Sequence, residues 1–228
     1  MANKPDDQQN AIDNLNDSLT GLGEKVQRNQ KFIFVVTAIG ALVVLGVLVY
    51  IFAFRDPKIQ AGDAKIGQAD LELAMGNDST ALAQYMEVAD KESHDAGNRA
   101  ALQAAILLYH TGKYEEALKY IKKFTSDSKL VGPAAFSLEG DCYVNTDQLP
   151  QAVDCYKKAI DKSDKNPYYT PWFMQKLARV YRAQGNYNAE ADVYEEILKE
   201  YPAYGEKNNI DIEKYLELAK LDAEKAAE

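Results

Sequence analysis

A turn residue recurs along the chain at a nearly constant interval, and this feature constrains the fold more than any other. The turn residues are Gly76, Gly112, Asp147 and Gly185, which stand 36, 35 and 38 positions apart. Each lies between two segments with helical patterning, where a glycine ends a helix cheaply in the left-handed conformation. A repeat of this length indicates helical hairpins that stack into a solenoid. The expected fold class is therefore all-α.

Small side chains flank these turns at matching positions. They are Ala105, Gly140 and Ala178 late in the first helix, and Ala81, Ala117 and Ala152 early in the second. Such residues let two antiparallel helices approach closely, and large residues fill the space between hairpins: Phe136, Leu138, Tyr143, Tyr156, Leu177, Tyr181 and Tyr194. Pro150 falls in the first turn of a second helix, where its missing N–H is not needed. The fourth repeat departs from the pattern, because Glu190 occupies the usual alanine position.

This pattern resembles the tetratricopeptide repeat (TPR), a helix-turn-helix unit of 34 residues. The resemblance implies about four TPR hairpins within residues 55–207, at about 62–95, 98–131, 133–166 and 171–204. The first helix of the first hairpin matches weakly. Residues 208–228 are expected to form a polar capping helix, with one apolar face made by Ile212, Tyr215, Leu216, Ala219 and Ala223.

An apolar segment precedes the repeats. Residues 32–54 carry no charge, and at 1.5 Å per residue they span about 34 Å, enough for a bilayer core. The segment is expected to be a transmembrane helix in contact with lipid, and a signal anchor that is not cleaved. A cleavable signal peptide would have a shorter apolar run and a small-residue cleavage site after it. The preceding residues 1–31 form a short tail.

Flanking charge does not decide the orientation of this segment. Three basic residues on one side, Lys25, Arg28 and Lys31, are matched by Arg55, Lys58 and Lys65 on the other. A short tail and a long acidic domain favour a cytoplasmic tail and an external domain, since long domains translocate largely regardless of charge. The tail also has a heptad stripe of Ile12, Leu15, Leu19, Leu22 and Val26. It predicts either a coiled-coil partner or a frayed tail.

Composition and reactive residues argue against several classes of function. The net charge of −9 and the lack of a basic stripe argue against nucleic-acid binding. Cys142 and Cys155 either pair across adjacent helices or serve as small packing residues. His94 is expected in a solvated loop, and His110 at the end of a helix. The sequence has no metal cluster, phosphate loop or nucleophile motif, so we expect no enzyme and no cofactor.

Protein binding is the expected function of such a solenoid. The TPR resemblance implies a concave surface lined by the first helices, at Leu102, Ile106, Tyr109, His110, Ser137, Asp141, Asn145, Trp172, Gln175, Arg179 and Arg182. An ordinary solvated or inter-helix face is the alternative for each position. Trp172 is the strongest candidate, because tryptophan is enriched at binding hot spots. A clamp for a terminal carboxylate is not expected, since only Arg179 and Arg182 are of the required kind.

The order of tail, membrane helix and repeats narrows the resemblance further. With the stretches LVGPAAFSLEGDCYVNTDQLPQAVDCYKKAI and TPWFMQKLARVYRAQGNYNAEADVYEEILKEYP, the chain looks like the bacterial inner-membrane TPR proteins classed as ancillary subunits of the SecYEG translocon. The resemblance implies a cytoplasmic amino terminus and a periplasmic TPR domain. It also implies association with SecYEG and a membrane-anchored periplasmic chaperone of the prolyl-isomerase type, and assistance to exported polypeptides. The alternatives are a TPR scaffold in cell-envelope biogenesis or division, and a cytosol-facing docking receptor.

Overall fold

The computed structural model describes residues 30–92 and 95–228, and the chain divides into two compact units, residues 1–58 and 59–228. The predictions for the tail, including its heptad stripe, and for His94 fall outside the described residues.

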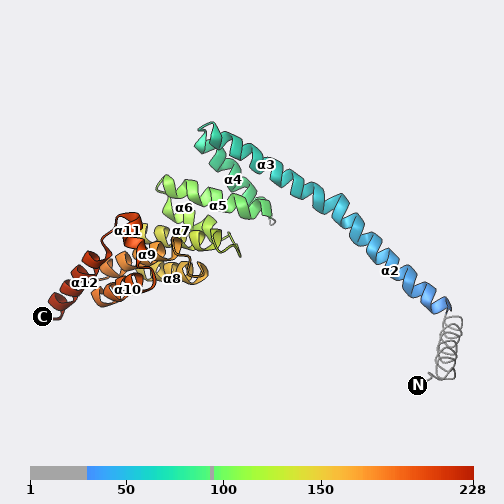
Figure 1. Ribbon diagram of the computed structural model, residues 1–228. Helices are drawn as coiled ribbons and strands as arrows, with labels where there is room; N and C mark the ends of the chain where they lie inside the picture. Colours follow the sequence, from blue (N-terminus) through green and yellow to red (C-terminus); the bar gives the residue numbers. More distant parts are fainter. Residues whose placement is uncertain (1–29, 93–94) are drawn as a thin grey trace, which may run out of the picture. The chain divides into compact units, whose positions relative to one another are not determined.

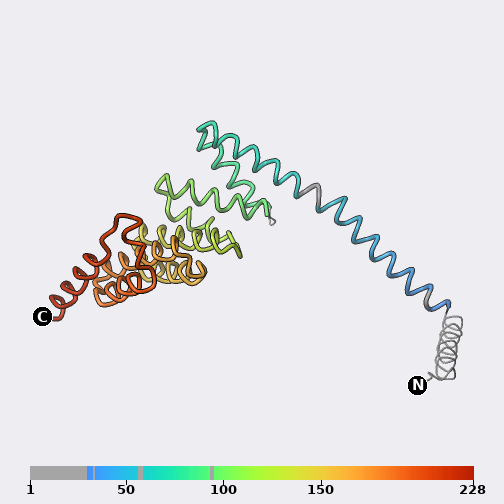
Figure 2. Tube along the Cα trace, viewed as in Figure 1, coloured from blue at the N-terminus to red at the C-terminus, as the bar shows by residue number. Residues whose placement is uncertain are grey.

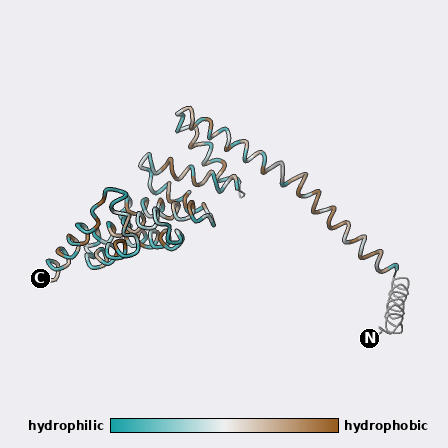
Figure 3. The backbone as a smooth tube through the Cα atoms, viewed as in Figure 1, coloured by the Kyte–Doolittle hydropathy of each residue, from teal (hydrophilic) through white to brown (hydrophobic). Residues whose placement is uncertain are grey.

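The first unit is dominated by an apolar helix. Helix α2 (Gln30–Tyr50) is followed by a five-residue π-helix, η1 (Ile51–Arg55), where the sequence predicted regular helix up to Phe54. The described side chains of α2 are exposed, and Figure 3 shows the hydrophobic colouring of this stretch. Among the described residues this is the one helical stretch that is long and apolar enough to cross a membrane. This finding rests on length and composition.

The second unit consists of helices, most of them joined by short turns, with a longer connection at residues 122–130 (Figures 1 and 2). The helices pair in chain order as α3 (Asp56–Ala74) with α4 (Asp78–Lys91), α5 (Asp95–His110) with α6 (Tyr114–Ile121), α7 (Val131–Asn145) with α8 (Leu149–Lys162), and α9 (Tyr169–Ala183) with α10 (Tyr187–Glu200). A short helix α11 (Ala203–Asn208) leads to the last helix, α12 (Ile212–Ala227). Consecutive helices from α4 to α10 pack on one another, and α12 packs on α10. The all-α solenoid predicted from the repeat is confirmed.

The four turn residues all adopt the left-handed conformation. Gly76, Gly112 and Gly185 have φ angles of 82°, 76° and 71°. Asp147, at the equivalent place in the third repeat, has φ of 57°, which aspartate tolerates better than most residues. The residue after each turn residue leads into the second helix of the hairpin. In the second hairpin, the backbone N–H of Lys113 donates to the carbonyl of Leu108 at 2.9 Å. This is the bonding pattern of a glycine-terminated helix.

Replacing Gly112 with valine is expected to lower the free energy of unfolding by about 1–3 kcal/mol, because a β-branched residue is strained at positive φ. Space does not limit the substitution, since no atom lies within 4 Å of an added Cβ. Gly112→Asn is the matched control, because asparagine adopts this conformation more readily. Chemical denaturation of both variants measures the effect. Equal losses for the two substitutions would contradict a cost that arises from φ.

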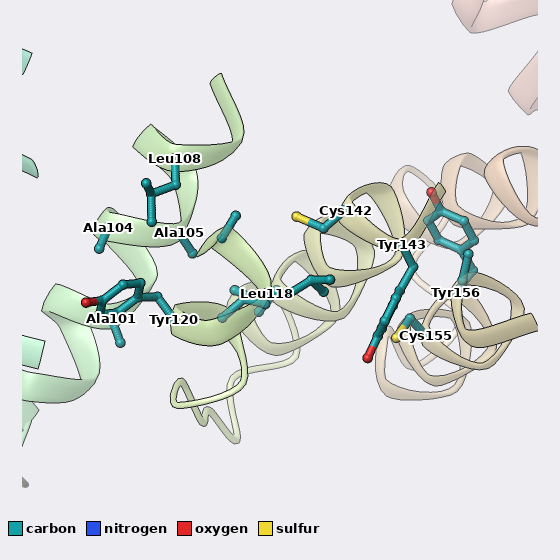
Figure 4. Packing of buried hydrophobic residues seen from close by; sticks show 14 of the residues in the cluster. Ala101, Ala104, Ala105, Leu108, Leu118, Tyr120, Cys142, Tyr143, Cys155 and Tyr156 are labelled. Carbon is teal, nitrogen blue, oxygen red and sulfur yellow. The ribbon is translucent and has the colours of Figure 1, made fainter. Parts of the chain in front are cut away.

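The core repeats with the same period as the turns. Small residues of the first helices, Ala69, Ala105, Gly140 and Ala178, are all buried. The residues that follow the turns by five positions, Ala81, Ala117, Ala152 and Glu190, are buried too. Four larger side chains complete the hairpins, namely Tyr85, Ile121, Tyr156 and Tyr194. Figure 4 shows part of this cluster, with residues of α5 to α8 directed into the space between helices.

The last helix is less polar on its outer side than the sequence predicted. Ile212 and Ala219 are buried as expected, and Tyr215 stacks on Tyr194 with 5.7 Å between ring centroids. Yet Tyr215 is 40% exposed, and Leu218 and Leu221 are exposed by 40% and 46%. Helix α12 therefore covers the end of the solenoid while its own outer side keeps an apolar strip.

The two cysteines are free thiols in the core. Cys142 lies on α7 and Cys155 on α8, and Figure 4 shows their sulfur atoms at separate places. Burial is the main cause that raises the pKa of each thiol to about 12. We therefore expect neither thiol to react with Ellman's reagent at pH 8 while the protein is folded, and both to react in denaturant. Rapid labelling of the folded protein would contradict this packing.

Candidate functional site

An apolar hollow lies across the first helices of three successive hairpins, α5, α7 and α9. Its volume is about 270 Å³. It is lined by Leu102, Ile106, Tyr109, His110, Val131, Ala134, Ala135, Ser137, Leu138, Asp141 and Trp172. Trp172 is 41% exposed and Val131 is 38% exposed, so large apolar groups meet solvent here. We call this the apolar hollow.

A second hollow, of about 260 Å³, adjoins the first, because Tyr109 and Asp141 line both. Its other lining residues are Val144, Asn145, Leu149, Tyr156, Lys176, Arg179, Val180 and Ala183. Two of these side chains are cations, and we call this the cationic hollow. Together the two hollows form one lined face on α5, α7 and α9, with contributions from α8.

Asp141 lies at the boundary between the two hollows and is bound by two neighbouring side chains. Its carboxylate accepts a hydrogen bond of 2.6 Å from the Tyr156 hydroxyl and one of 2.6 Å from Lys176 Nζ. Lys176 also donates to Ser137 Oγ at 3.1 Å and lies 4.1 Å from the centroid of the Trp172 ring. Burial and the nearby carboxylate raise the pKa of Tyr156 above its usual value, so this hydroxyl stays protonated and donates. The Asp141 charge is thus matched within the protein.

Arg179 differs from the other charged residues of this face. Its side chain is exposed in the cationic hollow. It forms no ion pair or hydrogen bond with any residue in the described part of the chain. The hollow therefore presents one cation whose charge is not matched locally, whereas Lys176 and Asp141 neutralise each other at 2.6 Å.

The structure brings together nine of the eleven residues predicted for the binding surface. Seven line the apolar hollow: Leu102, Ile106, Tyr109, His110, Ser137, Asp141 and Trp172. Asn145 and Arg179 line the cationic hollow. Gln175 and Arg182 line neither hollow. Gln175 is 5% exposed and accepts a hydrogen bond from the Tyr204 hydroxyl at 3.4 Å.

Lys176 is the functional candidate that the sequence analysis missed. It stands four residues after Trp172, which places both side chains on one helix face. That spacing was the signal available in the sequence. Val131 was missed as well, because it lies at the first position of α7 rather than within a helical pattern.

Arg182 instead joins three helices at the end of the solenoid. Its Nε donates to Glu190 of α10 at 2.7 Å, and its Nη1 donates to Asp222 of α12 at 2.8 Å. The Glu190 side chain is 1% exposed, whereas that of Arg182 is 39% exposed. Burial raises the pKa of the Glu190 carboxyl, and the Arg182 guanidinium opposes that rise. This ion pair explains why glutamate replaces alanine in the fourth repeat.

The described residues hold no cluster of side chains suited to metal binding. No group of three or more His, Cys, Asp or Glu side chains could hold an ion in residues 30–92 and 95–228. His110 is exposed at the end of α5, and its ring meets Tyr109 edge-on at 5.9 Å between centroids. This face presents apolar side chains and one exposed cation, Arg179.

Fold and surface together define a helical-repeat protein-interaction module. A model of the tetratricopeptide repeat-like domain family matches residues 53–182, and a tetratricopeptide repeat model matches residues 173–204. The chain belongs to the tetratricopeptide repeat-like domain family. Families of this kind are generally non-enzymatic scaffolds that bind protein partners.

Solved structures show the same fold. A crystal structure of MamA is 19% identical, with a TM-score of 0.52, over 70% of this chain and 96% of that chain. A second MamA structure is 18% identical with a TM-score of 0.54, over 73% and 93%. MamA residues 41 to the end from Desulfovibrio magneticus RS-1 are 14% identical with a TM-score of 0.51, over 62% and 76%. No curated protein matches the chain.

Proposed function

We propose that this protein is anchored in the bacterial inner membrane by residues 32–54 and binds exported polypeptides as they leave the SecYEG translocon. In this proposal the TPR domain is periplasmic and the amino terminus is cytoplasmic. The domain also links the translocon to a membrane-anchored chaperone of the prolyl-isomerase type. One observation carries the binding role, namely the two adjoining hollows with an exposed tryptophan and an unmatched arginine.

In this proposal the apolar helix holds the binding face at the membrane. A tether to the membrane beside the channel raises the local concentration of the module to the millimolar range that is typical of short linkers. Weak contacts to an emerging chain then suffice for frequent capture. The resemblance of nearly the whole chain to ancillary SecYEG subunits supports this location, and the exposed apolar surface of α2 supports the anchor.

Site-specific photo-crosslinking tests the proposal in cells. A crosslinker at Ala134, which lines the apolar hollow, is expected to capture exported polypeptides. A second at Val47 of α2 is expected to capture translocon or chaperone subunits. Asp154, exposed on α8 and outside both hollows, is the matched control position. If positions 47 and 134 never capture these proteins, the assignment to the translocon fails.

Two further measurements separate the alternatives. A carboxy-terminal fusion to alkaline phosphatase is expected to be active, because that enzyme works only outside the cytoplasm. Fluorescence of a green fluorescent protein fusion would instead indicate a cytosol-facing receptor. A membrane pull-down that yields cell-envelope biogenesis or division proteins, without translocon subunits, would indicate a scaffold of another complex.

A further inference from the structure

We infer that the two hollows together select an extended segment that carries a bulky apolar side chain and, two residues along, a carboxylate. This inference rests on the proposed binding of polypeptides and specifies which segments bind. It commits to one occupant, an acidic–apolar stretch of an unfolded chain.

The apolar hollow has the size and lining for a single large side chain. It holds about 270 Å³, and its walls include Leu102, Ile106, Leu138 and Trp172. Removing a leucine-sized side chain from water at such a surface is the main source of affinity. The ammonium group of Lys176 lies on the Trp172 ring and is paired with Asp141, so it adds no unmatched charge to this hollow.

Charge complementarity indicates which ligand group the cationic hollow binds. Arg179 is an exposed cation without an ion pair among the described residues, although the whole chain has a net charge of −9. The carboxylate that lines the cationic hollow, Asp141, is bound by Lys176 and Tyr156 at 2.6 Å each. A guanidinium group in this state favours a carboxylate from the ligand, because it presents several donors in a fixed plane.

The shared wall between the hollows favours the shortest spacing that places both side chains on one side of an extended segment. Tyr109 and Asp141 line both hollows, so the site for the apolar side chain and the site for the carboxylate are neighbours. In an extended segment, side chains of residues i and i+2 point to the same side and lie about 7 Å apart. The geometry therefore points to Leu-x-Glu, or the reverse order, rather than to two adjacent residues.

The single tryptophan of the chain reports occupancy directly, because Trp172 lies in the apolar hollow. The full chain in detergent is titrated with nine-residue peptides of glycine and serine that have Leu-Ser-Glu, Leu-Ser-Gln or Ser-Ser-Glu at the centre. The Leu-Ser-Glu peptide is expected to change the Trp172 fluorescence saturably. Loss of the glutamate charge is expected to weaken binding about three- to fivefold, as for a partly exposed ion pair of up to 1 kcal/mol. Loss of the leucine is expected to weaken it tenfold or more.

Arg179→Gln provides the decisive variant, with Lys225→Gln on α12 as a control that removes the same charge outside both hollows. Arg179→Gln is expected to abolish the preference for glutamate over glutamine. Lys225→Gln is expected to leave the preference intact. Equal binding of the two leucine peptides by the native chain overturns the inference, and so does a preference that persists in Arg179→Gln. Absence of any fluorescence change overturns it too, whereas capture of exported chains at Ala134 tests the proposed function independently.

Discussion

Replacing Arg182 with methionine is expected to lower the free energy of unfolding by about 2–4 kcal/mol at pH 7. The substitution keeps an apolar stem but leaves the Glu190 carboxylate buried without a counter-ion. Removing one partner of a buried pair costs several kcal/mol, and the partial exposure of Arg182 reduces that loss. Hydrogen exchange is expected to accelerate first in α12, since Asp222 loses its bond to α9. Chemical denaturation measures the total loss.

Two control variants isolate the cause. Arg182→Met/Glu190→Ala restores the alanine of the other repeats and removes the unpaired carboxylate, so it is expected to recover most of the loss. Arg179→Met makes the same chemical change one turn earlier, where no ion pair exists, and is expected to stay within about 0.5 kcal/mol of the native protein. If the double variant is no more stable than Arg182→Met, an uncompensated Glu190 charge does not explain the effect.

The stability of Arg182→Met is expected to depend on pH because of the Glu190 carboxylate. Burial raises the Glu190 pKa, and the guanidinium normally lowers it, so removing Arg182 raises the pKa further. The folded state of the variant then binds a proton more tightly than the unfolded state. Protonation of Glu190 therefore stabilises the folded variant. This contribution is fully present below the pKa of Glu190 in the unfolded state, and it is lost as pH rises through the pKa of Glu190 in the folded state. The difference in stability between Arg182→Met and the native protein is therefore expected to shrink as pH falls from 7 toward 5. Thermal unfolding of both proteins across this pH range measures it.

The hairpin pattern was accessible from sequence because it depends on local geometry. The left-handed turn at Gly112 and the small residue at Ala117 follow from spacing within one repeat, and both are confirmed. The reason for Glu190 was not accessible. Its partner Arg182 is on the preceding helix, and Asp222 lies 40 residues after that arginine. Pairing over such a separation depends on how α12 packs, which periodicity within the repeats does not encode.

The face that the two hollows line was predictable to within one residue of helix register. In the third repeat, Ser137, Asp141 and Asn145 follow one another at intervals of four and do lie on the lined face. In the fourth repeat the lined face instead continues from Trp172 through Lys176. A shift of one position turns a side chain by about 100° around the helix. That rotation places Gln175 and Arg182 toward neighbouring helices rather than in the hollows.

Replacing Gly140 with valine is expected to lower the free energy of unfolding by about 2–4 kcal/mol, because α8 packs directly against α7 at this position. A Cβ on Gly140 would lie 2.8 Å from a ring carbon of Tyr156. The ring is buried, and its hydroxyl is bound to Asp141 at 2.6 Å, so it cannot move aside without breaking that bond. Overpacking of this kind typically costs 1–3 kcal/mol, and the lost hydrogen bond adds to it.

Gly67→Val is the matched control, since Gly67 lies within α3 and no atom stands within 4 Å of an added Cβ. That change is expected to alter the unfolding midpoint little, whereas Gly140→Val/Tyr156→Leu is expected to recover part of the loss by removing the ring. Because Asp141 separates the two hollows, Gly140→Val is also expected to weaken binding of the Leu-Ser-Glu peptide, as read from Trp172 fluorescence. Native stability in Gly140→Val would mean that α7 and α8 lie farther apart than this contact requires.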